Sequence, residues 1–251
     1  MQNGHLRAGL VMVALAVAIA DGSRGQERPE WDTTVAAGVS LTRGNSRTML
    51  LNGSVITERK GAPDELKFGA EANYGETEVT DTNGTKSMEA NVQNARGFAD
   101  YRRLLTARDF AYLGVELRHD DIAGLDYRLV AGPGVGRYWL KGERQRLMTE
   151  LGAAYVREKQ AGDTDDRVVL RLAERYEWKL SATAKLWEAV EYLPALEDFE
   201  RYLLNGEIGI EAAVNTRVSL RLVAQDKYNS EPAPGSDAND LLVIGALTCK
   251  L

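Results

Sequence analysis

The chain contains very few of the residues that build disulfide frameworks and metal centres. It has one cysteine, Cys249, and two histidines, His5 and His119, among 251 residues. A single cysteine excludes an intramolecular disulfide, and so few histidines exclude a histidine-rich metal site. We therefore predict neither a metal centre nor a cofactor.

Excess positive charge and long apolar runs are also missing. The chain has 31 basic and 37 acidic residues, which gives a net charge of −6. This balance argues against nucleic-acid binding, which needs a basic surface. After the N-terminal segment, no stretch reaches the 18 or so consecutive apolar residues of a membrane-spanning helix. A membrane protein of this sequence has to cross the bilayer with strands.

The N-terminal segment has the pattern of a secretory signal peptide. A short polar start containing Arg7 precedes an apolar run from Ala8 to Ala20, which ends in a small-x-small sequence. Such a run is too short to cross a membrane as a helix. We predict a signal peptide at residues 1–20, an N-terminal tail at 21–32 and one domain at 33–251. An exported protein without a spanning helix is periplasmic, extracellular or an outer-membrane barrel.

The rest of the chain alternates between apolar and polar residues with a period of two. In the most regular segment, Leu204, Ile208 and Ile210 share one face, whereas Glu207 and Glu211 share the other. This alternation is typical of a β-strand with one apolar face. Similar patterns predict strands at residues 33–42, 47–59, 66–76, 87–101, 110–118, 125–140, 147–158, 167–178, 182–193, 201–214, 217–228 and 240–250.

The length of these segments distinguishes a membrane barrel from a globular sheet. They run for about 10–15 residues, whereas globular strands average five or six and a tilted membrane strand needs about 9–11. We predict an all-β, antiparallel up-and-down transmembrane β-barrel of about twelve strands, with long outer links and short periplasmic turns. Aromatic residues near the strand ends predict two interfacial girdles: Tyr74, Phe98, Tyr101, Phe110, Tyr127, Trp139, Tyr176, Trp178, Tyr192, Tyr202 and Tyr228.

In such a barrel, the polar faces point into the lumen and bring acidic and basic side chains together. Two interpretations remain open. Paired charges can staple the lumen shut, because buried charges need partners, or they can line a narrow polar channel. We expect Arg128 to pair with Glu116 on the preceding strand. The predicted lumen network comprises Glu116, Arg118, Arg128, Glu150, Arg171, Arg175, Glu207, Glu211 and Arg221.

Three local patterns resemble known sites. Asp163, Asp165 and Asp166 form the densest acidic group of the predicted outer links, where carboxylates can bind divalent cations; a solvated acidic rim is the simpler expectation. The glycines at 132–136 (GPGVG) lack the following helix of a dinucleotide site, so they predict close approach by another segment. His119 beside Asp120 suggests a hydrolase, but no serine stands out as a partner. We predict no enzymatic activity.

Two segments carry a resemblance to a known family. Residues 38–48 (GVSLTRGNSRT) lie near the first hairpin, and residues 121–128 (DIAGLDYR) lead into the glycines at 132–136. With these motifs the chain resembles the YdiY-like, salt-induced outer-membrane proteins, a bacterial β-barrel family of unknown function. The resemblance implies a location in the bacterial outer membrane and a link to salt stress. It carries no catalytic residues.

These observations support three functional hypotheses. The first is an outer-membrane barrel that acts as a narrow pore or stabilises the envelope. Its expected partners are outer-membrane lipid and lipopolysaccharide, the barrel-assembly machinery and divalent cations at the acidic outer loops, but no nucleic acid. The second is a soluble periplasmic barrel whose apolar faces turn inward around an apolar ligand. The third is an outer-membrane hydrolase that depends on His119.

Overall fold

The computed structural model describes residues 31–42, 48–61 and 63–251, without the side chains of 40–42. The predicted signal peptide and residues 21–30 of the predicted tail lie outside this part. The first strand begins at Trp31, two residues before the predicted domain boundary.

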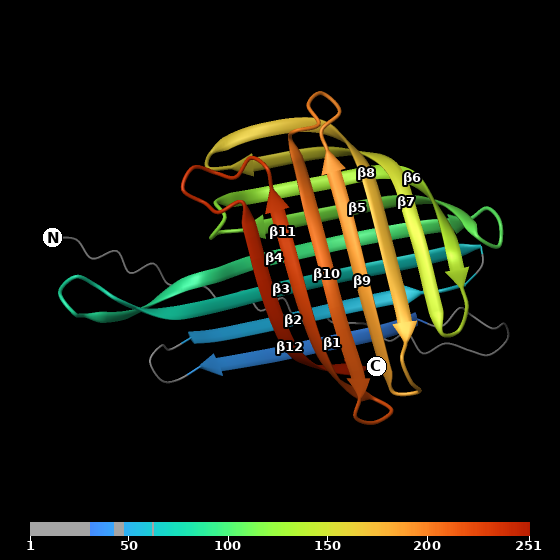
Figure 1. The fold of residues 1–251 in the computed structure, drawn as a ribbon, viewed down its shortest axis with the longest axis horizontal. Helices are drawn as coiled ribbons and strands as arrows, with labels where there is room; N and C mark the ends of the chain where they lie inside the picture. Colours follow the sequence, from blue (N-terminus) through green and yellow to red (C-terminus); the bar gives the residue numbers. More distant parts are fainter. Residues whose placement is uncertain (1–30, 43–47, 62) are drawn as a thin grey trace, which may run out of the picture.

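The described residues form one closed barrel in which each strand is antiparallel to its neighbours (Figure 1). The predicted fold class is confirmed. No helix in the described ranges is long and apolar enough to cross a membrane. The strands are β1 (Trp31–Thr42), β2 (Thr48–Arg59), β3 (Asp64–Thr80), β4 (Lys86–Leu104), β5 (Asp109–Asp120), β6 (Leu125–Lys141), β7 (Gln145–Gln160), β8 (Asp163–Lys179), β9 (Ala184–Pro194), β10 (Tyr202–Ala213), β11 (Val218–Asn229) and β12 (Asn239–Lys250).

The outer surface is largely apolar, although Glu188 lies on it opposite Ile208, and the inner surface is polar. On β10, Ile208 lies on the outside with 51% of its surface exposed, whereas the neighbouring Glu207 lines the interior. The same holds on β5, where Leu117 is exposed outside and Glu116 lines the interior. So many exposed apolar side chains on one face suit lipid rather than water. The arrangement is the reverse of the soluble, apolar-ligand barrel that the sequence left open.

Most of the predicted aromatic girdle residues do lie on the outside, near the two ends of the strands. Tyr192, Tyr202 and Tyr228 form one stack, with ring centroids 5.3 and 5.5 Å apart, and Trp31 contacts Phe68 near the other end. Phe98 and Phe110 were assigned to the girdles wrongly. Phe98 lines the lumen and Phe110 is fully buried inside the barrel. Side chains alternate along a strand, and both positions fall on the side of β4 or β5 that faces inward.

The two ends of the barrel differ in their connections. The even-to-odd links at one end have three or four residues each, whereas the links 195–201 and 230–238 at the other end are longer. Of the predicted outer loops, the one at 159–166 is largely strand and half of the one at 77–86 is strand. The β3–β4 hairpin projects beyond its neighbours (Figure 1). The pairing of β3 with β4 shifts register between Gly75 and Glu76, where Asn91 is the extra residue of a bulge.

Candidate functional site: the barrel lumen

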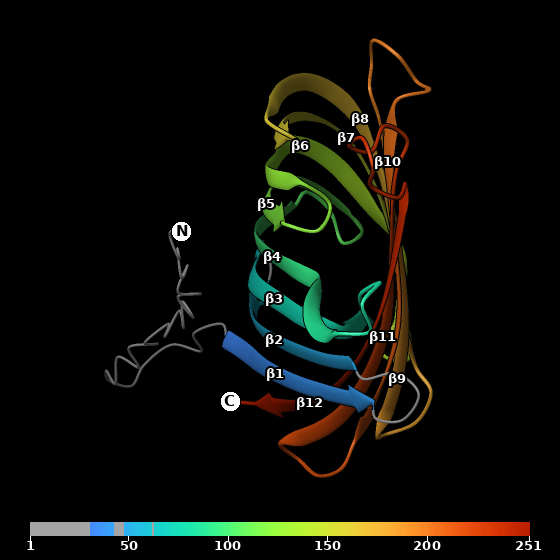
Figure 2. The same ribbon diagram turned by 90° about the vertical axis from the view of Figure 1, so that its left-hand side faces the viewer.

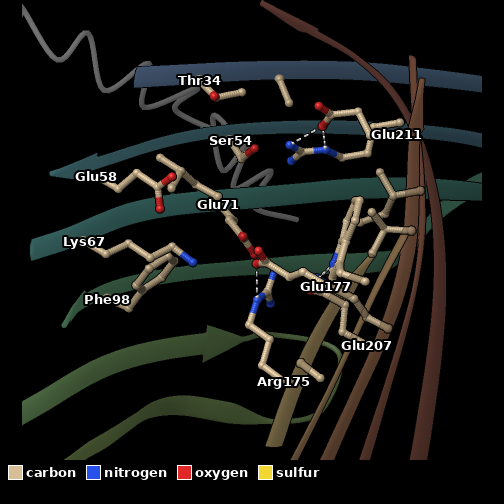
Figure 3. Close-up of a pocket in the computed structure, with 18 of the residues that line it drawn as sticks. Thr34, Ser54, Glu58, Lys67, Glu71, Phe98, Arg175, Glu177, Glu207 and Glu211 are labelled. Carbon is tan, nitrogen blue, oxygen red and sulfur yellow. Dashed lines mark hydrogen bonds and ion pairs between the residues drawn. The ribbon is translucent and has the colours of Figure 1, made fainter. Parts of the chain in front are cut away.

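A cavity of about 640 Å³ occupies the lumen. Its lining extends from Thr216 and Arg217, in the short turn at one end, to Arg118 and Lys227 near the opposite end of their strands. Figure 3 shows side chains from facing walls converging on this space, with Lys67 on one side and Arg175 on the other. Figure 2 shows β1 to β6 along one side of the barrel and β9 to β11 on the opposite side.

Aromatic side chains that rest on glycines of β6 fill the part of the barrel interior next to this strand. A Cβ at Gly134 would lie 2.4 Å from the Tyr112 ring, and one at Gly136 would lie 2.3 Å from the Phe110 ring. Phe110 also packs on Tyr138, with centroids 5.0 Å apart, and both are fully buried. Burial of one such ring contributes roughly 1.5–3 kcal/mol. The glycines thus make room for rings, as close approach predicts.

Charged side chains cover this aromatic layer on the side of the open lumen. The guanidinium of Arg102 lies over Phe110 at 5.5 Å, and that of Arg171 lies over Tyr112 at 5.1 Å. Glu150 joins the two arginines through contacts of 2.9 and 2.8 Å. Arg171 also binds Glu191 at 2.6 Å, so ion pairs run continuously from β4 to β9. Each buried charge in this chain of contacts has an opposite charge beside it, as burial requires.

Further ion pairs line the rest of the lumen. Arg96 lies between Glu71 and Glu116, at 3.6 and 2.7 Å, and Glu116 also binds Arg118 at 3.0 Å. Near the short-turn end, Glu211 pairs with both Arg221 and Lys185, and Arg175 pairs with Glu177. Glu207 has neutral partners instead, because the indole N–H of Trp187 and the amide of Gln225 donate to it.

The structure places all nine residues of the predicted lumen network at the inner surface. The expected pairing of Arg128 with Glu116 was wrong. Arg128 lies directly opposite Arg118 on β5 and opposite Glu158 on β7, so the carboxylate of Glu158 binds it. The sequence did not predict that Phe110, Tyr112 and Tyr138 pack together inside the barrel. The inward glycines of β6 are the sequence signal that points to it.

Ion pairs also hold the longer loops over one mouth of the barrel. Asp165 binds both Arg167 and Arg201, the latter at 2.7 Å, and Arg201 binds Glu231 in the 230–238 loop at 2.7 Å. Partial burial would lower the pKa of Arg201, but these carboxylates outweigh it and raise the pKa. The loop reaches the β5–β6 turn, where a Cβ on Gly124 would contact Ala233 at 3.9 Å. A small cavity of about 50 Å³ remains beneath it.

The other sites suggested by the sequence have different surroundings. Asp165 binds arginines, and Asp166 binds Arg157 and the Tyr155 hydroxyl. Within the part of the chain that is described, no group of three or more His, Cys, Asp or Glu residues is arranged to hold a metal ion. The ring nitrogens of His119 contact Asp121 and the backbone carbonyl of Asp126, so Asp120 is not the partner that a hydrolase triad would require.

Comparison with known proteins agrees with this architecture. Residues 35–250 match the family described as "Protein of unknown function, DUF481". The chain belongs to this family. A DUF481 relative by sequence is the "Uncharacterized protein YdiY" of Escherichia coli (strain K12), which is 26% identical over 160 residues. The match covers 63% of this chain and spans 60% of that protein's length.

Solved structures of similar fold are outer-membrane barrels. The NanC porin superposes with a TM-score of 0.50 at 9% identity, covering 88% of this DUF481 chain and 98% of NanC. The translocator domain of the autotransporter NalP from Neisseria meningitidis has a TM-score of 0.47 at 11% identity, covering 88% and 86% of the two chains. At 9% identity, the NanC match establishes a shared fold alone.

Proposed function

We propose that this protein is a narrow, water-filled pore of the bacterial outer membrane that admits small polar solutes. The cavity of about 640 Å³ carries the proposal, because a barrel stapled shut would leave no such space. The apolar exterior supports outer-membrane lipid and lipopolysaccharide as the surroundings, and it supports the barrel-assembly machinery as the insertion partner.

The charges of the lumen favour small neutral or zwitterionic solutes. Acidic and basic side chains alternate along the wall and neutralise each other, as in the pairs of Arg96 with Glu116 and Arg221 with Glu211. A ring of one sign would select ions of the opposite sign, whereas mixed charges give weak ion selectivity. The same side chains occupy part of the cross-section, so the conductance is small.

Planar-bilayer recording tests the proposal. Purified protein is expected to give small, discrete conductance steps with nearly equal cation and anion permeability. Glu231→Gln removes one partner of Arg201 and loosens the 230–238 loop, so larger steps are expected. Glu197→Gln changes an exposed carboxylate of the neighbouring loop and serves as the matched control. Absence of steps in correctly folded protein contradicts the pore.

The continuous ion-pair chain from Arg102 to Glu191 favours a second candidate, a role in stabilising the envelope. The family resemblance links that role to salt stress. A strain lacking the gene would then grow poorly at high salt, and both wild-type protein and a non-conducting variant would restore growth. If only the conducting protein restores growth, the pore is the function that matters under salt stress.

A further inference from the structure

The seam that closes the barrel differs from every other contact between neighbouring strands. β1 and β12 share four residue pairs, from Thr34–Lys250 to Ala37–Leu247, whereas each other neighbouring pair shares eight or more. β1 continues to Thr42 and β12 extends back to Asn239, but no described residue beyond Ala37 pairs with β12. In both ribbon views the two strands diverge beyond this point (Figures 1 and 2).

Two glycines mark the point of divergence. A Cβ at Gly38 would lie 2.1 Å from the carbonyl oxygen of Gly245 and 2.2 Å from Oδ1 of Asn52. The backbone of β12 therefore passes directly against the inward side of β1 instead of lying beside it in the sheet. Any larger residue at Gly38 would push the strands further apart. The seam is thus a wedge that begins at Gly38 and widens towards the end of the barrel that carries the longer loops.

An open strand edge is unusual in a membrane barrel. Backbone N–H and C=O groups that face hydrocarbon without partners are costly, which is why membrane barrels close completely. Here β1 beyond Ala37 pairs only with β2, and β12 before Leu247 pairs only with β11, among the residues that are described. The unpaired backbone N–H and C=O groups of these two edges need hydrogen-bond partners from another molecule or from water in the lumen.

The lumen wall beside the wedge differs chemically from the opposite wall. In the middle of β12, β1 and β2, the lining side chains are small, apolar or neutral, and charges occur only towards the strand ends. The lining side chains are Ala36, Asn52, Ser54, Ile244, Ala246 and Thr248. Outside, the rim of the wedge is apolar: Val39, Leu241 and Val243 are between 53% and 67% exposed. The surface is therefore suitable for an alkyl chain on both sides of the opening.

A polar group without a partner lies at the apex of the wedge. Oδ1 of Asn52 is buried and accepts no hydrogen bond, although its neighbours Asn73 and Asn94 pair with each other at 2.9 Å. A buried acceptor left unpaired is costly, so it favours a ligand with a hydroxyl or amine donor. The loop 230–238 covers the mouth at the end of the barrel towards which the wedge widens.

We propose that the wedge between β1 and β12 is a lateral portal that binds an amphiphile with a hydroxylated head and an alkyl chain. The head lies in the lumen near Asn52, and the chain passes between Val39 and Val243 into the lipid. This function goes beyond solute conduction, and it does not depend on the protein conducting ions.

Cysteine pairs test the open seam in full-length protein in lipid vesicles, with Cys249→Ser as the background. The control pair, Ala37→Cys with Leu247→Cys, lies in register and is expected to form a disulfide on mild oxidation. The test pair, Val39→Cys with Gly245→Cys, lies at the wedge and is expected to remain reduced. Gly245 has open space around it, so the replacement is tolerated. Equal oxidation of the two pairs would show a closed seam and overturn the portal.

Photolabelling tests the ligand. The probe is a monoacylglycerol with a diazirine in its acyl chain, and mass spectrometry locates the label. Labelling is expected at Ile244 and Ala246 inside the lumen, as well as at Leu220 and Leu222, which contact bulk lipid. A bismaleimide linker that joins the two introduced cysteines of the test pair should lower the lumen labelling at least fivefold and leave the Leu220 labelling unchanged. The same linker in the control pair should change neither.

A further variant tests whether Asn52 binds the head of the amphiphile. Asn52→Ala is expected to lower the lumen labelling at least threefold while the fold, judged by migration of unheated protein on a gel, is retained. Lumen labelling that the linker does not change would mean that the probe enters by another route. Disulfides between two protein molecules through the Val39→Cys substitution would mean that a second copy covers the edge. Either result overturns the proposal.

Discussion

At the scale of single residues, Glu150 shows how this barrel tolerates charge inside. Its side chain is 5% exposed and holds two arginines, Arg102 and Arg171, that would otherwise repel each other. Removing one partner of a buried ion pair is strongly destabilising, because the remaining charge stays without compensation. Pairs at the rim, such as Lys159 with Asp126, are exposed and contribute little.

Replacing Glu150, and separately Lys159, tests whether the buried ion pair is worth more than the exposed one. Glu150→Gln is expected to lower the free energy of unfolding by about 3 kcal/mol, the lower end for a broken buried pair. Lys159→Gln, which breaks an exposed pair, should cost less than about 1 kcal/mol. Denaturant titration in lipid vesicles measures both. Equal, small effects would mean that lumen water screens Glu150 as completely as a surface group.

Ile208 tests the environment of the outer face. It lies on β10 between Glu188 and Ala224 of the adjacent strands, and half of its surface is exposed. Ile208→Arg should cost roughly 2–4 kcal/mol if the side chain faces the middle of the bilayer. Ile208→Leu is the control and should be nearly neutral. The facing carboxylate of Glu188 can pair with this arginine, so the variant is also made with Glu188→Gln. An arginine that is tolerated in that background would place this surface in water rather than in lipid.

At the scale of elements, β6 is the strand against which the aromatic rings of the barrel interior pack. Its inward positions carry glycine where its neighbours carry aromatic rings, so the rings of Phe110 and Tyr112 lie flat over its backbone. Sequence alternation predicts the strand and its inward face. The side chains that pack against this inward face, Phe110 and Tyr112, lie on β5. Their size determines how much of the lumen remains open.

Replacing Gly134 by a larger residue should destabilise the fold through its contact with Tyr112. Gly134→Val is expected to cost about 1–3 kcal/mol by overpacking against Tyr112. Tyr112→Ala in the same chain should recover most of that loss, which a double-mutant cycle would show as coupling. Gly53→Val is the control, because nothing lies within 4 Å of its added Cβ. Additive losses would mean that Tyr112 does not rest on Gly134.

At the scale of the whole molecule, closure of the barrel determines how the protein behaves in detergent. Eleven of the twelve strand contacts are long ladders of eight or more pairs, and only the β1–β12 seam is short. Unfolding of such a barrel has to break many backbone hydrogen bonds together.

This closure predicts heat-modifiable migration. Protein from the outer-membrane fraction should migrate differently on an SDS gel before and after boiling, because the unheated barrel stays folded in detergent. Recovery in the soluble fraction after cell breakage would contradict the outer-membrane location. Identical migration of boiled and unboiled samples would contradict a barrel that stays closed in detergent.

The sequence alone determined the twelve strands, the face that most side chains take and the lipid-suited exterior. These follow from the period-two geometry of an extended chain, which is local. Only the tertiary structure decided that Arg128 binds Glu158, that rings fill the interior above β6, and that β1 leaves β12 at Gly38. Those contacts depend on the register between strands and on which walls face each other across the lumen, and the spacing of residues along one strand does not determine them.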